Sequence, residues 1–93
     1  MIRSFKSREA ERIWRGEASK KLPADIQHVV RRKLRMLDNA STLDDLRNPS
    51  ANRLATLKGK RAGQHSIRIN QQWRLCFIWN DGQIDSVEII DYH

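Results

Sequence analysis

The sequence lacks several features that define whole classes of small protein. Its 93 residues include one cysteine, Cys76, so no disulfide can form within the chain. Its three histidines are scattered, and no Cys/His spacing indicates a zinc site. No apolar stretch has the length of a signal-peptide core or a membrane span, so we expect a cytoplasmic protein without a membrane partner. Without repeats or low-complexity segments, residues 1–93 are expected to form one domain.

Acidic residues are also scarce relative to basic ones. Eighteen Lys and Arg face eleven Asp and Glu, which gives a formal net charge of +7. A positive field of this size on a small chain favours a polyanion, most simply nucleic acid, or an acidic protein partner. A well-solvated basic surface would account for the same composition, and the charge alone says nothing about catalysis.

Hydrophobic periodicity divides the chain into a helical first part and a strand-rich second part. Apolar spacings of three and four predict helices over residues 8–15 and 23–38, with one further helical turn at 42–46. A period of two predicts strands, with an opening one at residues 2–5 and four more at 53–58, 65–70, 73–79 and 84–92. Tight turns make the sheet antiparallel, so the expected fold class is α+β, with two N-terminal helices packed on one face of a small sheet.

The register of the central hairpin follows from its side chains. A three-residue loop at residues 70–72 places Ile67 opposite Leu75 and His65 opposite Phe77, which forms a coherent apolar face. A two-residue loop would place Arg74 among the isoleucines. Because a slip of one residue moves every side chain to the other face, the first register is favoured.

This register has an electrostatic consequence on the face away from the helices. Arg68 lies directly opposite Arg74, and like charges paired across strands are destabilising. Either Glu88, which a similar register places beside Arg74, offsets the repulsion, or the two arginines converge on a phosphate. The pattern supports both readings equally. Tyr92 has the parity of Glu88 and is therefore expected on the same face.

The last residues complete the set of candidate groups. Asp91 has the opposite parity to Tyr92, whereas His93 is not held by a ladder beyond it and can turn either way. Lys58 comes from the neighbouring strand, with its side undetermined. The expected constellation is thus cationic, with one or two proton-transfer groups.

This set contains no acid pair, no metal-ligand set and no glycine-rich phosphate loop, so we expect neither a metal nor a cofactor. It suits metal-free RNA cleavage, in which the ribose 2′-hydroxyl is an internal nucleophile. That reaction needs a base, cations for the pentavalent phosphate and an acid for the leaving 5′-oxygen. The alternative is a basic surface that binds RNA or protein without chemistry.

The same residues lie in motifs that resemble HigB-type toxins of the RelE/ParE superfamily of bacterial toxin–antitoxin modules. The motifs are "MIRSF", "LKG", "RAGQHSIRIN", "WRLCFIW" and "VEIIDYH", and the similarity runs over essentially the whole chain. It implies a small curved antiparallel sheet flanked by helices, and a ribosome-dependent mRNA endonuclease that cuts in the A site of the 70S ribosome. It also implies a HigA-type helix-turn-helix antitoxin, through which alone the toxin would meet operator DNA.

The resemblance extends to individual positions. Asp91, Tyr92 and His93 match functional residues of HigB toxins, Arg74 matches a phosphate-contacting arginine, and Lys58 matches a basic residue of the site. The expected catalytic residues are therefore the last three together with Arg74. The expected RNA- and phosphate-binding residues are Lys58, Arg68 and Arg74.

One position departs from the pattern. Some HigB toxins carry a functional histidine three residues before the lysine, where this sequence has Ala55. Three explanations stay open: His93 or Tyr92 acts as the base alone, His65 substitutes, or the ribosome supplies the missing chemistry. Two other functions remain as alternatives, namely a ParE-like toxin that binds gyrase without cutting RNA, and a weakly active toxin that acts mainly as an antitoxin-dependent operon regulator.

Overall fold

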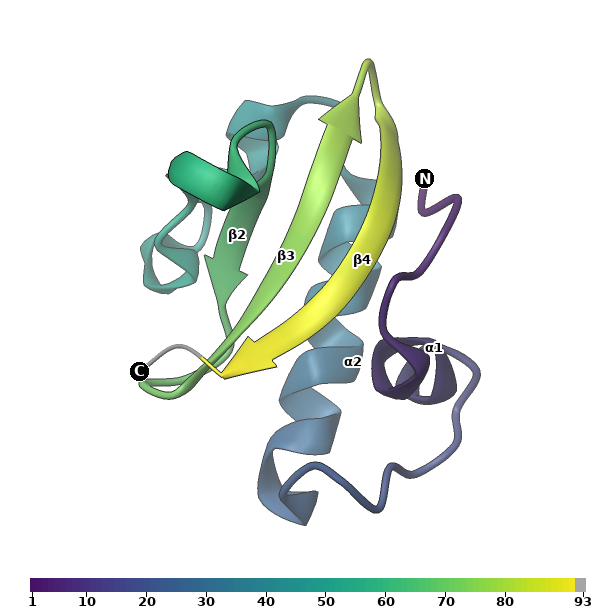
Figure 1. Ribbon diagram of the computed structural model, residues 1–93. Helices are drawn as coiled ribbons and strands as arrows, with labels where there is room; N and C mark the ends of the chain where they lie inside the picture. The colour runs from purple at the N-terminus through teal and green to yellow at the C-terminus, as the bar shows by residue number, and fades with distance from the viewer. Residues whose placement is uncertain (92–93) are drawn as a thin grey trace.

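A computed structural model describes residues 1–91 of the chain, so the terminal site candidates Tyr92 and His93 lie outside the described residues. The elements follow one another as α1 (Arg8–Trp14), α2 (Ala24–Asn39), η1 (Leu43–Arg47), η2 (Ser50–Asn52), β1 (Ala55–Thr56), η3 (Gly59–Arg61), β2 (His65–Arg68), β3 (Trp73–Asn80) and β4 (Gln83–Asp91), where η denotes a 3₁₀ helix (Figure 1). The two helices and the sheet of four antiparallel strands confirm the α+β class.

The strands are arranged in the order β1-β2-β3-β4, and α2 lies behind the sheet in Figure 1. The first strand is shorter than the sequence predicts, because only Ala55 and Thr56 pair with β2. Arg53 has a left-handed backbone (φ 44°), which is incompatible with an extended strand, and η3 already begins at Gly59. The predicted strand over residues 53–58 is therefore wrong at both ends.

Both helices bury the face that their periodicity predicts. Ser7 caps α1, because its hydroxyl accepts a hydrogen bond from the Ala10 backbone N–H. On the buried face of α1 lie Ala10 and Ile13. The second helix begins after Pro23 and buries residues spaced by three and four, among them Val30. Among residues 1–91, no helix is both long and apolar enough to cross a membrane.

The central hairpin has the predicted register. Ile67 pairs with Leu75 and His65 with Phe77. Ile67, Leu75 and Phe77 are completely buried in the core that α2 covers, and Trp73 packs partly buried against it. The apolar face of this hairpin is thus directed towards α2, which sends the alternate residues to the opposite face.

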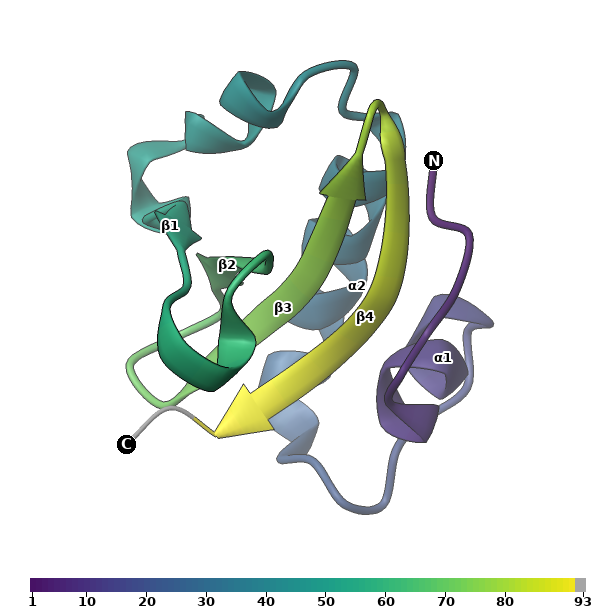
Figure 2. The ribbon, with the colours of Figure 1, turned by 45° about the horizontal axis from the view of Figure 1, so that its top comes forward.

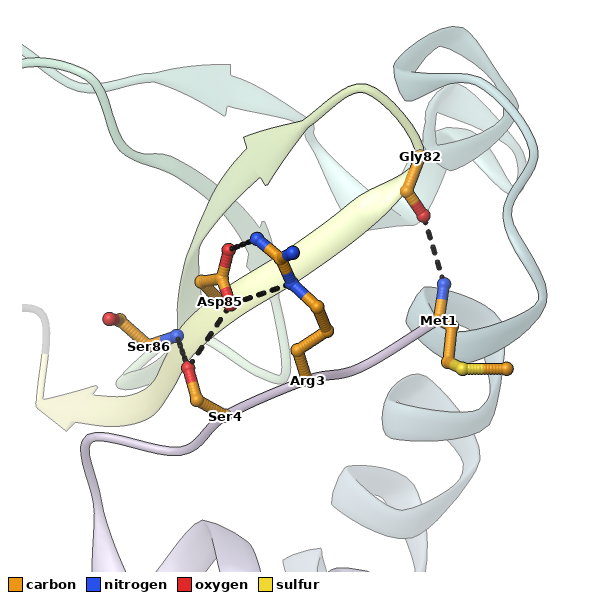
Figure 3. Close-up of polar contacts among 6 residues, drawn as sticks. All are labelled: Met1, Arg3, Ser4, Gly82, Asp85 and Ser86. Carbon is orange, nitrogen blue, oxygen red and sulfur yellow. Dashed lines mark hydrogen bonds and ion pairs between the residues drawn. The ribbon is translucent and has the colours of Figure 1, made fainter.

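The first residues of the chain pair with β4, in parallel orientation. Bridges join Ile2 to Ile84 and Phe5 to Val87, so the predicted opening strand is present as two isolated bridges. Figure 3 shows the polar contacts that accompany them, including Arg3 Nε and Nη2, which donate to the two carboxylate oxygens of Asp85 at 3.1 and 2.5 Å. The N-terminal segment therefore covers the outer edge of β4 along its first half.

A β-bulge in β4 decides which side chains reach the face away from α2. Trp79 pairs with Ile84, but Cys76 pairs with Glu88, so two residues of β4 stand opposite one of β3. Without this extra residue, the pairing that starts at Trp79 would place Glu88 opposite Leu75, on the core face. The bulge turns Glu88 to the other face, and Ser4 accepts the Ser86 N–H there at 2.8 Å (Figure 3).

Candidate arginine cleft

The face of the sheet away from α2 carries the predicted arginine pair. Arg68 stands directly opposite Arg74 in the β2–β3 ladder, as the register predicts. This face is not fully open, because Ser66 and Cys76 on it are completely buried. In Figures 1 and 2, η3 lies in front of the sheet, on the side opposite α2.

The Arg74 guanidinium is oriented by neighbouring oxygen atoms. Its Nε donates to the Ser66 hydroxyl at 2.8 Å, and its Nη2 donates to the backbone oxygens of Arg53 at 2.6 Å and Ser66 at 3.4 Å. A backbone oxygen orients Arg68 as well, since Arg68 Nε donates to the Asn70 carbonyl at 3.0 Å. Carbonyl and hydroxyl dipoles thus hold the two opposed cations in place.

Glu88 does not balance these arginines in the way the sequence suggested. It reaches their face, but it stands opposite Cys76, whereas Ile90 is the residue opposite Arg74. Its carboxylate forms ion pairs with Lys6 at 3.4 Å and Arg61 at 3.6 Å. Because Arg61 belongs to η3, this pairing fastens η3 across the sheet.

Three arginines line one cleft of about 380 Å³, together with two carboxamide side chains. Its lining residues are Arg53, Arg68, Asn70, Gln71 and Arg74. Within residues 1–91, neither Arg53 nor Arg68 forms an ion pair with a carboxylate. The cleft is therefore strongly cationic and suits a phosphate group, which the planar fork of arginine binds through paired hydrogen bonds.

Sequence reasoning missed Arg53. Arg53 is the first residue of the predicted strand over residues 53–58, and the sequence pattern does not indicate on which face of the sheet its side chain lies. The left-handed conformation at Arg53, which ends η2, turns the chain so that both its carbonyl and its side chain meet the Arg74 region. A left-handed arginine carries no local sequence signal, because glycine, asparagine and aspartate are the residues that usually mark this conformation.

The other predicted site residues lie at different distances from this cleft. Lys58 is exposed in the cap position of η3 and does not line the cleft. Asp91 stands opposite Trp73, on the predicted parity, and its Oδ2 accepts a hydrogen bond from Gln72 Nε2 at 3.1 Å. Asp91 thereby ties the end of β4 to the β2–β3 loop, whose residues 70 and 71 line the cleft.

Ala55, where some HigB toxins have histidine, lies next to the arginines. It pairs with Ser66, the residue whose hydroxyl holds Arg74. Opposite residues of a ladder share a face, so the Ala55 side chain belongs to the arginine face. The structure thus puts the departure from the family pattern beside the candidate site.

The histidine that could have replaced it does not reach this face. His65 stands opposite Phe77 with ring centroids 6.0 Å apart, on the core side of the sheet. Its Nδ1 lies 3.2 Å from the Thr56 hydroxyl, and burial lowers the pKa of the imidazole. His65 therefore does not share the face on which Ala55 and the arginines stand.

The buried thiol on the arginine face is not a reactive group. Cys76 is completely buried, and that burial raises the pKa of its thiol, which keeps it protonated. A buried thiol of this kind packs as a small apolar side chain.

Solved structures share the fold of this chain. YafQ from E. coli has a TM-score of 0.66 and 12% sequence identity, with 98% of this chain and 91% of YafQ covered. A toxin–antitoxin complex of YoeB and YefM from Staphylococcus aureus has a TM-score of 0.62 and 18% identity, with 100% and 98% covered. At these identities the likeness shows a shared fold, that of YafQ and of the YoeB–YefM complex.

Sequence similarity shows the family to which the chain belongs. The model of a family described as "RelE-like toxin of type II toxin-antitoxin system HigB" matches residues 3–93. Toxin HigB-1 of Vibrio cholerae is 40% identical over 83 residues, which cover 88% of this chain and 87% of that protein. Endoribonuclease HigB of Proteus vulgaris is 29% identical over 93 residues, the full length of both. The chain belongs to the HigB-like family of type II toxins.

Proposed function

We propose that this toxin is a ribosome-dependent endoribonuclease that cuts mRNA in the ribosomal A site. The observation that carries the proposal is the cleft in which Arg53, Arg68 and Arg74 meet, two of them without a carboxylate partner in residues 1–91. Such a site suits a polyanion whose phosphate gains negative charge during reaction. The name of the Proteus vulgaris relative, an endoribonuclease, supports the same activity.

The reaction proceeds without a metal ion. A base removes the proton of a ribose 2′-hydroxyl, and the 2′-oxygen attacks the adjacent phosphorus. The bond to the 5′-oxygen then breaks, and an acid protonates that oxygen. The products are a 2′,3′-cyclic phosphate and a 5′-hydroxyl end. DNA lacks the nucleophile and stays uncut.

The residues take different parts in this reaction. Arg74 and Arg68 bind the phosphate and stabilise the negative charge that develops on the pentavalent phosphorus. Hydrogen bonds to backbone carbonyl oxygens hold their guanidinium groups in place for this role. We assign the proton transfers to Tyr92 and His93, since histidine titrates near neutrality. Asp91 orients that terminus through its hydrogen bond to Gln72.

Lys58 and the partners complete the proposal. Lys58 lies outside the cleft and contacts the RNA backbone on its path across η3. The partners are the 70S ribosome, its bound mRNA and a HigA-type antitoxin that neutralises the toxin and carries it to operator DNA. A site of action on the ribosome makes the toxin cytoplasmic.

The test is primer extension on one mRNA in a purified translation system, with and without ribosomes. Cuts within A-site codons that need ribosomes are the expected result. Intact mRNA together with inhibited supercoiling by gyrase would contradict this function and would show that the protein acts as a ParE-like toxin. Intact mRNA and normal supercoiling, with operator binding by the antitoxin complex, would leave an operon regulator.

A further inference from the structure

A lysine is buried in the core-facing side of α2, and no acidic side chain among residues 1–91 forms an ion pair with it. Lys33 is 4% exposed and lies one turn from Val30 and next to Leu34, which are both completely buried. Burial, followed by the charge of Arg32, lowers the pKa of its ammonium group. A buried ammonium is costly to desolvate, so its position calls for a specific contact.

That contact is the side chain of Asn52. Lys33 Nζ donates to Asn52 Oδ1, and Asn52 is itself completely buried. The Asn52 amide nitrogen donates to the backbone oxygens of Leu46 at 3.0 Å and Asn48 at 3.3 Å. One asparagine thus closes the loop between η1 and η2 and fastens it to α2.

The residue after Asn52 belongs to the arginine cleft. Arg53 continues from the buried asparagine with a left-handed backbone, its side chain lines the cleft, and its carbonyl accepts from Arg74 Nη2 at 2.6 Å. Lys33 is therefore connected to the Arg74 guanidinium in three steps. These are its hydrogen bond to Asn52, the peptide unit that follows Asn52, and the hydrogen bond from Arg74 to the Arg53 carbonyl. Figure 2 shows how the chain makes this possible, because the segment from η1 to η3 runs round the β2 side of the sheet from α2 to the opposite face.

We propose that Lys33 and Asn52 are positioning residues for the phosphate site, which fix the Arg53 carbonyl and through it the direction of the Arg74 guanidinium. The RNA part of this inference rests on the proposed function. The geometric part does not, because it concerns only the orientation of Arg74. A displacement of about 1 Å at a reacting group can lower a rate by about 10²-fold, so a loop held by one buried pair is enough to govern activity.

The test compares Asn52→Ala and Lys33→Met with a control, Ile13→Val. Ile13 is completely buried in α1 and lies outside this network, so its variant lowers stability without altering the loop. All proteins are measured well below their melting midpoints, where each is folded. The first readout is hydrogen exchange at the Arg74 Nε–Hε group by NMR, with the resonance identified by its absence in Arg74→Lys. The second is the single-turnover cleavage rate on ribosomes saturated with toxin.

We expect exchange at Arg74 Hε to be faster by about tenfold in both network variants, and unchanged in the control. Cleavage should fall by about tenfold or more in the same two variants at saturation. Network variants that match Ile13→Val in both readouts would overturn the proposal. If Asn52→Ala does not fold, Lys33→Met decides, because methionine keeps an apolar stem of similar length. If Arg74 loosens as expected but no protein, including the wild type, cuts RNA, the positioning role stands and the proposed nuclease function fails.

Discussion

Replacing Arg74 with alanine tests both its structural and its proposed catalytic role. The substitution leaves the completely buried Ser66 hydroxyl without its donor, which costs about 1–3 kcal/mol. It also removes the repulsion from Arg68 directly opposite, worth about 0.2–1 kcal/mol. The net loss of about 1–2 kcal/mol corresponds to a fall in Tm of about 5–15 °C, so the variant should still fold at 25 °C.

The effect on cleavage should be much larger than this loss of stability explains. Removing one preorganised donor to a developing oxyanion typically costs about 10²–10³-fold in rate, and we expect Arg74→Ala to fall in that range. Arg74→Lys keeps the charge but lacks the planar fork, so we expect it to recover only part of the rate.

The assay is single-turnover cleavage of a defined mRNA on purified ribosomes, read by primer extension. It is run at 25 °C on proteins whose Tm and near-UV spectra show that they are folded. A rate for Arg74→Ala within about threefold of the wild type would refute the reasoning, and the Arg68–Arg74 pair would then be a structural feature of the hairpin.

Three further predictions concern the terminus, Ala55 and the N-terminal segment. Removing Tyr92 and His93 should abolish cleavage while circular dichroism and Tm stay close to those of the wild type, and full activity in that truncated protein would refute a catalytic terminus. Ala55→His should raise the single-turnover rate by about tenfold or more, because the new imidazole would stand on the arginine face, and an unchanged rate would mean that a base is not limiting. Hydrogen bonds from Arg3 hold the pKa of the Asp85 carboxyl below 3.8, so this pair stabilises the fold above that pH and loses its effect as the pH falls through the lowered pKa. The Tm of Asp85→Asn should therefore lie below that of the wild type at pH 7, with a difference that shrinks towards pH 2, whereas a constant difference would contradict this cause.

Strand alternation predicted the part of the site that lies within one hairpin. A single apolar face decides the β2–β3 register, and that register places Arg68 opposite Arg74, as the structure has them. The apolar face of α2 follows from an equally local signal, the spacing of three and four between its apolar residues.

The contacts of Glu88 could be predicted only in part. Its face was predicted, but its partners depend on the bulge at Ser86, which regular alternation does not contain. The odd spacing between the buried residues Ile84 and Val87 is the sequence signal of that bulge. The pairing with Lys6 and Arg61 depends on where η3 and the N-terminal segment lie, which is a matter of tertiary structure.

Sequence patterns did not predict how the loop between η1 and η2 contributes to the arginine cleft. Lys33 lies at the same helical spacing as the buried apolar residues of α2, but its partner Asn52 lies in a turn-rich segment with no periodicity. Arg53 reaches the cleft through a left-handed turn that no local signal marks. Long-range contacts of this kind arise from how the loop packs, and side-chain patterns along the chain do not encode them separately.

The most direct test of the central claim is to replace a single 2′-hydroxyl in the mRNA. An mRNA is programmed so that one known codon occupies the A site, with 2′-deoxyribose at the nucleotide whose 3′-phosphate is cut. Primer extension with the wild-type toxin should show cleavage of the all-ribose message and none at the deoxy position, because the nucleophile is missing there. Cleavage at that bond at an undiminished rate would contradict attack by the RNA's own 2′-oxygen, and with it the roles proposed for the arginine cleft and the terminus.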